Sequence, residues 1–560
     1  MEILKRKSVI IAMGVVVLAL LLAVVQLARP SKAQSPRLER FVPADTVGFI
    51  EVNDLRAQAL HVIESEAWRE FTKENESASS VFMMGANHAG ALDASYAIAL
   101  LGVAANAEGR PEPQFALVAE FNDWNARWTF ERRVLSLVSR SEEKGVTTKT
   151  ENYGDREINS VAPEGRHGFS YAHVKTTLYL SNTSDAIKRL LDVRDGKTPS
   201  LETNQTFAHA RARSKSVDGM FGFVDGAALT RIVDGAPPGD EQKSVNAFKE
   251  FFHGSGASSV ESVAFTSAFE DGRVVERFVV VAPHRDGVLA TVAANPPTQG
   301  SLLALVPEDA VQVFDASIAN APQTFDQMVA LMSQVAGQAG HKTPADALSE
   351  FTEKTGVDMR GELLGSLGTE FCAAQLAAGE EPGGVVLLAL KDEAAFARAL
   401  VKFAEHEKRA LTERDYKGVA IHTIAGEKEH GLEYAFVGGN FVASGKGAMV
   451  ERVIETAQGG RALSASAAYA SAKSQAAGQP QFVYYNSNTE YLNHLGHTLK
   501  GEEAFKTEGQ RANLRPSFAF GVTQTDGFYV ESRTPLGTFP RLLTAVSSRL
   551  VTEKKEKTSE

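Results

Sequence analysis

Two stretches of this chain contain residue types at spacings that could bind a phosphate or a metal ion. The first is Gly439 to Gly447 (GNFVASGKG), which has the glycine-rich character of a phosphate-binding loop. A P-loop needs four residues between its glycines, then Lys followed by Ser or Thr. Here five residues separate Gly439 from Gly445, and Gly447 stands where the hydroxyl is needed. We therefore interpret the stretch as a strand that turns into a helix.

The second stretch contains His494 and His497, which are three residues apart. On a helix this spacing can place two imidazoles on one metal ion. However, no third ligand is suggested nearby, and Gly496 weakens the helix that would hold the pair. His167 and His173 flank an expected strand and are interpreted as surface or partly buried residues. We assign no metal ligand from the sequence.

The sequence contains no recognisable catalytic motif. The single cysteine, Cys372, lies in an apolar run and is interpreted as a small buried hydrophobe. The chain contains no G-x-S-x-G elbow, no H-E-x-x-H and no glycine-rich dinucleotide fingerprint. Asp45 and Asp309 are interpreted as turn formers that hydrogen-bond to their own backbone. We therefore assign no catalytic or cofactor-binding residue and no cofactor.

A tryptophan pair is open to two interpretations. Trp124, Trp128, Leu135 and Val138 recur at near-helical spacing after an expected strand. The pair could be a ligand platform, or it could belong to the buried stripe of a helix. Because the stripe explains all four residues, we favour core packing.

The composition limits the class of protein. A chain of 560 residues is too long for one core, so we expect two to four domains. The 43% hydrophobic and 23% charged residues are typical of a globular protein. A net charge of −11 argues against a nucleic-acid partner. One cysteine excludes an intrachain disulfide framework and a cysteine-rich metal site.

The amino terminus predicts export. A basic end (residues 1–7) precedes an uncharged apolar run (residues 8–28) that is long enough to cross a bilayer as a helix of about 20 residues. Ser31-Lys32-Ala33 has the form of a cleavage site, so a removed signal peptide is the alternative to a transmembrane anchor. We favour the anchor. Residues 29–40 are then a linker, and the bulk of the chain is extracytoplasmic, either periplasmic or extracellular.

The elements that follow are organised around a segment that occurs twice and consists of a turn followed by a strand. We call this segment the opener. Phe41 to Val52 (FVPADTVGFIEV) returns as Leu305 to Asp315 (LVPEDAVQVFD), a step of 307 − 43 = 264 residues between the prolines. In both copies a proline and an acidic turn precede an apolar strand. Further matches follow in the same order at a similar step: Tyr153 with Tyr416, Tyr171 with Tyr434, Ser181 with Ser444, and Asp271-Gly272 with Asp526-Gly527. This order predicts an internal duplication.

The resulting fold class is α+β. Short period-two runs separated by turn residues predict a largely antiparallel sheet in each copy, and amphipathic segments between them predict packed helices. We expect an N-terminal transmembrane helix followed by two homologous domains, residues 41–294 and 302–550. Residues 295–301 are the expected linker, and residues 551–560 the expected disordered, charged tail.

Three segments also resemble a known family. They are Val42 to Val47 (VPADTV), Leu363 to Gly368 (LLGSLG) and Leu387 to Ala395 (LLALKDEAA). Together they resemble the bacterial domain-of-unknown-function family DUF3352, over most of the chain after the anchor. The resemblance implies an exported, often membrane-anchored protein. It supplies no reaction, ligand or catalytic residue.

Our leading hypothesis is a non-enzymatic binding or scaffolding protein of the cell envelope, held to the membrane by its N-terminal helix. Two similar domains side by side would create a groove for an envelope protein or an apolar ligand. The alternative is a carrier of a lipid or other apolar ligand, which needs an apolar cavity. A second alternative is an unrecognised hydrolase, which predicts strongly shifted titratable groups within one cleft.

Overall fold

A computed structural model describes residues 37–73, 94–105, 111–140, 146–163, 168–215, 219–236, 242–339, 342–377, 383–426, 431–489 and 513–537. The expected anchor at residues 8–28, the charged tail, His167 and the pair His494 and His497 lie outside these residues. Within them, no helix is both long enough and apolar enough to span a bilayer.

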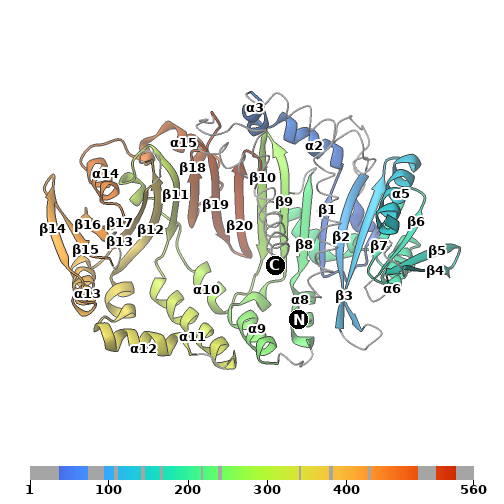
Figure 1. Cartoon of the computed structure of the whole chain (residues 1–560), viewed down its shortest axis with the longest axis horizontal. Helices are drawn as coiled ribbons and strands as arrows, with labels where there is room; N and C mark the ends of the chain where they lie inside the picture. The colour runs from blue at the N-terminus through green and yellow to red at the C-terminus, as the bar shows by residue number, and fades with distance from the viewer. Residues whose placement is uncertain are drawn as a thin grey trace.

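In the first half of the chain, the described residues form ten strands, with helices between several of them (Figure 1). Its elements are β1 (Gly48–Val52), α2 (Leu55–Glu64), α3 (Glu66–Thr72), β2 (Ala94–Ala105), β3 (Pro111–Phe121), α5 (Trp124–Arg140), β4 (Val146–Tyr153), β5 (Arg156–Pro163), β6 (Phe169–Val174), β7 (Thr177–Ser181), α6 (Ser184–Arg194), α7 (Gln205–Arg213), β8 (Met220–Asp225), α8 (Gly226–Gly235), α9 (Gln242–Gly254), β9 (Ser262–Glu270), β10 (Arg273–Val281) and α10 (Gly287–Ala293).

The second half follows a similar plan. Its elements are β11 (Ala310–Ser317), α11 (Ala321–Ala339), α12 (Pro344–Thr355), β12 (Leu367–Leu376), β13 (Gly383–Leu390), α13 (Glu393–His406), β14 (Leu411–Tyr416), β15 (Val419–Ile424), β16 (Leu432–Val437), β17 (Asn440–Ser444), α14 (Gly447–Ala457), α15 (Ala467–Lys473), β18 (Phe482–Asn486), β19 (Ser517–Gln524) and β20 (Gly527–Thr534).

All of the strands belong to one 20-stranded antiparallel sheet, which confirms the predicted α+β class. In the first half the strand order is β4-β5-β6-β7-β3-β2-β1-β8-β9-β10. In the second half it is β14-β15-β16-β17-β13-β12-β11-β18-β19-β20, the same order with each number raised by ten. The sequence predicted two sheets; the structure joins them, because β10 pairs with β20 in the middle (Figure 1).

At the junction, the two halves are related by an approximate two-fold axis. Val275 lies opposite Arg533, and Val279 lies opposite Tyr529, with Arg277 opposite Glu531 between them. Because β10 and β20 hold equivalent places in the two strand orders, the Arg277–Glu531 pair marks the point about which the halves are related.

One predicted turn is shifted by a residue. In the first half, Asp271 and Gly272 form the turn between β9 and β10, both with positive φ, as expected for a tight Asp-Gly hairpin. In the second half, Gln524 pairs with Gly527, so the turn residues are Thr525 and Asp526. The prediction of Asp526-Gly527 was therefore wrong by one position, because Gly527 already belongs to the strand.

The two openers fold alike but not entirely as predicted. A hydrogen bond to the proline carbonyl closes each turn, from Thr46 to Pro43 and from Ala310 to Pro307. The acidic side chains, however, bind arginines of a distant helix instead of their own backbone. Asp45 accepts two hydrogen bonds from Arg189 of α6, at 2.7 and 2.9 Å, and the equivalent Asp309 binds Arg452 of α14. This part of the prediction is corrected.

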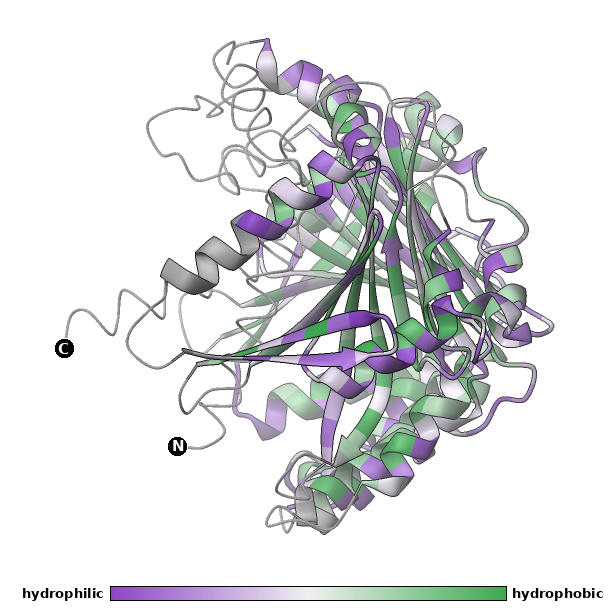
Figure 2. Cartoon of the chain, turned by 90° about the vertical axis from the view of Figure 1, so that its right-hand side faces the viewer, coloured by the Kyte–Doolittle hydropathy of each residue, from purple (hydrophilic) through white to green (hydrophobic). Residues whose placement is uncertain are grey.

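The main core lies on one face of the sheet, which we call the core face. Helices α6 and α7 cover it in the first half, and α14 and α15 cover it in the second half, forming one continuous cluster of buried residues with the strands. Phe207 of α7 contacts Phe49, Phe221 and Phe223 edge to face. Hydrophobic residues follow the strands, whereas the β4–β5 hairpin carries more hydrophilic ones (Figure 2).

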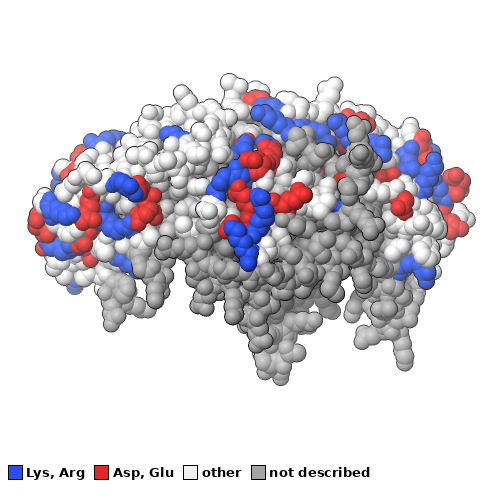
Figure 3. Space-filling model, turned by 90° about the horizontal axis from the view of Figure 1, so that it is seen from above, with Lys and Arg blue, Asp and Glu red and all other residues white. Residues whose placement is uncertain are grey.

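Charges of both signs are mixed on one surface of the molecule. Seen from above, basic and acidic side chains are interspersed in small clusters (Figure 3). An example is Arg515, which binds Glu66 of α3 and also Asp271 at 2.5 Å. Such exposed pairs contribute little to stability individually.

Candidate functional site

The strongest candidate for a binding surface is the second face of the sheet, opposite the core face. The strand register places one row of residues directly opposite one another across eleven neighbouring strands, from β2 to β13. Every member of this row is apolar or glycine: Ile98, Ile50, Gly222, Phe265, Phe278, Val530, Gly521, Phe482, Ala316, Phe371 and Leu388. We call this set the apolar row.

Parts of this face are open to solvent. Ile50 is 49% exposed and Phe278 is 42% exposed. Beside the row, Phe314 of β11 and Val386 of β13 point to the same face and are 37% and 38% exposed. Phe314 contacts Phe482 with ring centroids 5.8 Å apart, so the open area includes an aromatic cluster. Several large apolar side chains exposed together on one surface commonly mark an interaction site.

Helices limit the open area at both ends. In the first half, Phe130 of α5 packs on Tyr96 and Phe121. In the second half, Phe396 of α13 packs on Phe441 at 4.9 Å between ring centroids. The part of the face that α5 and α13 leave uncovered lies over the middle strands, where the two halves meet.

A second concave feature lies at the base of the first half. It is a cleft of about 880 Å³ between the opener turn, the β2–β3 hairpin, α6 and α8. The Asp45–Arg189 ion pair forms part of its wall, and Arg189 also donates to the carbonyl of Leu101 at 3.1 Å. The rest of its described lining is mainly apolar and includes no Ser, Cys or His: Val47, Leu101, Gly102, Val103, Pro111, Pro113, Ala228, Ile232, Gly235 and Ala236, with Gln114 and Arg231. This lining suits an apolar ligand.

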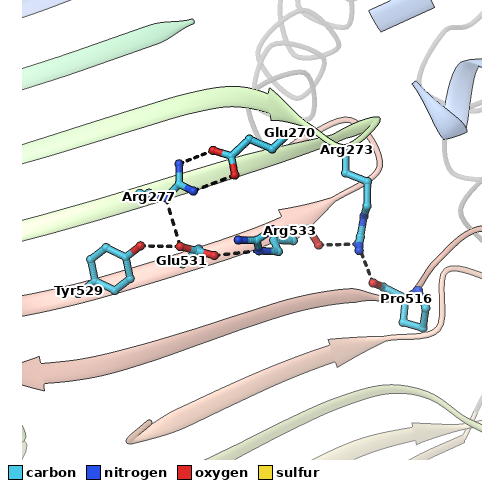
Figure 4. Close-up of polar contacts among 7 residues, drawn as sticks. All are labelled: Glu270, Arg273, Arg277, Pro516, Tyr529, Glu531 and Arg533. Atoms are coloured by element: carbon cyan, nitrogen blue, oxygen red, sulfur yellow. Dashed lines mark hydrogen bonds and ion pairs between the residues drawn. The ribbon is translucent and has the colours of Figure 1, made fainter. Parts of the chain in front are cut away.

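A polar network lies on the core face where β10 meets β20 (Figure 4). The Arg277 guanidinium donates to both oxygens of Glu270, at 2.7 and 3.0 Å, and to Glu531 at 3.2 Å. The hydroxyl of Tyr529 and the guanidinium of Arg533 donate to the same Glu531 carboxylate. All of these groups have partners within the network, so the geometry indicates a structural joint between the halves.

The pKa shifts in this network follow from burial and pairing. Burial lowers the pKa of Arg273 to about 10, while it donates to the carbonyls of Pro516 and Arg533. Burial opposes the charge of Arg277, but its bonds to Glu270 outweigh that effect and raise its pKa. Burial and the hydrogen bond to Glu531 both raise the pKa of Tyr529.

A pair of buried acids lies beneath the linker of the second half. Asp315 of β11 is fully buried, and burial raises its pKa to about 6. Glu370 of β12 accepts hydrogen bonds from the backbone N–H groups of Gly300 and Ser301, at 2.8 and 2.9 Å. Burial alone would raise the pKa of Glu370, but bonds from Ser301 and Thr298 outweigh it, so its pKa is lowered. Thr298 donates to both acids.

The motifs singled out in the sequence have structural roles. Gly439 lies in the turn before β17, and the chain then enters α14 at Gly447, as expected for a strand that turns into a helix. Cys372 is fully buried, and burial raises the pKa of its thiol, which confirms a buried cysteine. His173 is about half-exposed beside Glu131 at 3.5 Å. Among the residues that the structure describes, no three His, Cys, Asp or Glu side chains converge as a metal site would require.

The preferred interpretation of the tryptophan pair was wrong. Trp124 is 55% exposed and Trp128 is 43% exposed, and their rings lie nearly parallel with centroids 6.1 Å apart. The residues of α5 that pack on the sheet are Ala126 and Phe130. Spacing of three or four places residues on one helix face but does not say whether that face is buried.

The apolar row was not predicted from the sequence. A signal for it exists in β10, whose residues 273–281 read RVVERFVVV. Apolar residues occupy both alternating sides of this strand, so both faces of the sheet are apolar there. The register across strands, which the sequence does not give, is what aligns them.

Comparisons with known proteins follow this geometry. No curated protein matches the chain. Among solved structures, crystal form III of TP0453 is 9% identical and covers 45% of this chain and 81% of that one, with a TM-score of 0.21. Crystal form I of TP0453 is 13% identical and covers 46% of this chain and 98% of that one, also with a TM-score of 0.21. Such a score is too low to bear on fold or function.

A family model gives a clearer match. The family described as "Protein of unknown function (DUF3352)" matches residues 294–514, from the linker through most of the second half. The match includes two of the three segments on which the resemblance was based, Leu363 to Gly368 and Leu387 to Ala395. Residues 294–514 of this chain are thus similar to the DUF3352 family.

Proposed function

We propose that this chain is a non-enzymatic binding or scaffolding protein of the cell envelope and that the open middle of its sheet is the binding surface. The observation that carries the proposal is the apolar row, with Ile50 and Phe278 exposed within it. An apolar surface in contact with water is unfavourable by about 25 cal/mol for each Å². A partner that covers this face would recover that free energy.

The proposal includes two homologous domains. The equal strand orders support it, and so do matched side-chain contacts. Tyr153 donates to Asp192 of α6 at 2.9 Å, and Tyr416 donates to Glu455 of α14 at 2.8 Å. The junction brings the two copies of the open face side by side, so the binding surface is larger than one copy alone would offer.

The proposal also places the protein outside the cytoplasm. The apolar residues 8–28 would anchor it in the membrane, and the described chain would lie on the extracytoplasmic side. A reporter enzyme fused after residue 560 tests this location. Activity of a reporter that works only in the cytoplasm would contradict it.

The alternative function is that of a carrier for a lipid or other apolar ligand. The cleft of about 880 Å³, with its mainly apolar lining, favours this alternative. Its volume is within the range of small-molecule sites. The Asp45–Arg189 pair at its wall could contact a polar head group.

Photo-crosslinking at the open face distinguishes the two functions. A benzophenone amino acid in place of Phe278 in the full chain should react with whatever covers the face in intact cells. A protein adduct would support a scaffold, and a lipid adduct would support a carrier. The matched control is Met328 of α11, which is similarly exposed at 41% but lies on a helix.

The control defines the result that would contradict binding at the open face, by a protein or by a lipid. If the probe at Phe278 gives no more adduct than the probe at Met328, then the open face has no occupant. A second variant, Phe278→Asp, should reduce the amount of adduct formed by a probe at Phe314. Unchanged crosslinking in that variant would also contradict an occupant of the apolar row.

A further inference from the structure

The outer face of α5 carries a feature that core packing does not explain. Trp124 and Trp128 are exposed and lie nearly parallel on the side of the helix that faces away from the sheet. The guanidinium of Arg132 lies 4.7 Å from the Trp128 ring centroid. We call these three residues the tryptophan platform. Helix α5 lies at the end of the molecule remote from the β10–β20 junction (Figure 1).

The second half contains a natural control for this platform. Asp123 caps the start of α5 by accepting from the N–H of Ala126, and Asp392 caps α13 by accepting from Ala395. Both helices follow the equivalent strands β3 and β13 and pack on the same sheet face.

Aligning Asp123 with Asp392 defines which positions of α5 and α13 are equivalent. Trp124 corresponds to Glu393, Trp128 to Ala397 and Arg132 to Val401. The same helix therefore forms and packs without tryptophans, so the fold does not require them. A large exposed aromatic pair without a structural role indicates a contact with another molecule.

The charges around the platform select the kind of partner. Asp123 is engaged as the helix cap, and Glu131 is bound by Arg127 at 2.6 Å and lies 3.5 Å from His173. Among the residues that the structure describes, no carboxylate pairs with Arg132. The charge left available on the platform is therefore positive, and it complements an anionic surface.

We propose that the tryptophan platform contacts a membrane surface that contains anionic lipids. Indole rings and arginine side chains both favour the boundary between head groups and acyl chains, where an apolar body and a polar end are solvated together. The platform lies on the outer face of a helix, a shape that suits a flat surface. The inference does not depend on the apolar row or on the N-terminal anchor.

A fluorescent label beside the platform tests the proposal in the full chain. Asn125 lies between the two tryptophans and is exposed, and its equivalent on α13 is exposed Ala394. The variants N125C and A394C can each be labelled with nitrobenzoxadiazole, because the native Cys372 is fully buried. The labelled chains are reconstituted into vesicles of phosphatidylcholine, alone or mixed with phosphatidylglycerol.

The expected result is a shift of the emission to shorter wavelength for N125C in the mixed vesicles, with no shift for A394C. The shift should be lost in W124E/W128A, which copies the residues of α13 and should fold with an unchanged Tm. It should become weaker in R132Q and in vesicles of phosphatidylcholine alone.

Three results would overturn the proposal. One is an equal shift, or none, at both label positions. Another is a shift that persists in W124E/W128A. The third is a shift at N125C that a soluble cell-wall glycan causes and vesicles do not, which would assign the platform to carbohydrate binding.

Discussion

At the scale of single residues, Asp315 is in an unusual environment for a carboxyl group. It is fully buried, and one of its oxygens, Oδ1, has no hydrogen-bond partner. Thr298 donates to the other oxygen at 2.6 Å, and Glu370 places a second negative charge nearby. Lys473 of α15 supplies the opposing positive charge but does not offset the burial. The carboxyl group is therefore more easily protonated than in water.

This raised pKa predicts a pH-dependent stability. The pKa of Asp315 rises from 3.8 in the unfolded chain to about 6 in the folded chain. The stability that protonation of Asp315 gives the folded state is therefore fully present below about pH 4 and is lost as the pH rises through 6. The difference corresponds to roughly 3 kcal/mol. We expect Asp315→Asn to unfold at higher urea concentration than the wild type at pH 7, and the advantage to disappear near pH 4.

The control for this measurement is Asp309→Asn, which removes an exposed acid of the neighbouring turn. That variant should keep the wild-type dependence on pH. If Asp315→Asn and the wild type show the same difference in unfolding free energy at both pH values, then Asp315 does not titrate as inferred.

At the scale of elements, one side chain makes many of the hydrogen bonds that hold the linker before β11. Glu370 accepts hydrogen bonds from Thr298, Gln299, Gly300 and Ser301. Glu370→Gln replaces an acceptor by an NH₂ group that faces these donors. We expect it to lower the unfolding free energy by roughly 2 to 3 kcal/mol.

Hydrogen exchange provides the local measurement. The amides of residues 299–301 should exchange faster in Glu370→Gln than in the wild type. The exposed Glu413→Gln variant on β14 should change neither the exchange nor the stability. Unchanged exchange at the linker in Glu370→Gln would show that the carboxylate does not hold it.

The junction between β10 and β20 allows a double-mutant cycle. Arg277 and Glu531 are both buried, so Arg277→Met or Glu531→Leu alone should lower the unfolding free energy by about 3 kcal/mol, because each leaves a buried charge with fewer partners. The double variant should be less destabilised than the sum of the two by at least about 1 kcal/mol. The exposed pair Arg360–Asp326 should show a coupling below about 1 kcal/mol. Additive effects at the junction would exclude direct coupling.

Most of the elements could be predicted from the sequence, and their relation to one another could not. The meander of β4 to β7 follows from period-two runs separated by turn residues, and the caps Asp54 and Asp123 follow from their side-chain chemistry. Burial of α5 was mispredicted because helical spacing identifies a face without saying what it contacts. The apolar row was missed because its members come from eleven strands whose register is set by long-range pairing.

At the scale of the whole molecule, the two halves share a sheet and should assemble when they are made as separate chains. Residues 37–296 would expose β10, and residues 297–560 would expose β20, each as an open sheet edge. Pairing of unlike halves restores the Arg277–Glu531 contact, whereas pairing of like halves places equal charges opposite each other. We therefore expect a one-to-one complex when the halves are expressed together.

Native mass spectrometry measures the composition of that complex. Mixed pairs should exceed like pairs, and Arg277→Glu should reduce the mixed pairs because Glu531 would then face another carboxylate. An exposed control such as Lys417→Glu, which affects a pair on the β14–β15 turn, should leave the ratio unchanged. A random mixture of like and unlike pairs would contradict the role of the junction charges.

The contact of Arg277 with Glu531 also has a historical consequence. If the two halves descend from one gene whose product assembled with itself through this strand, then a residue at this position once faced its own copy. Opposite charges became possible only after the gene was doubled and each copy could mutate separately. The salt bridge would then be younger than the fusion, and any surviving single-copy descendant should carry an uncharged side chain at that position.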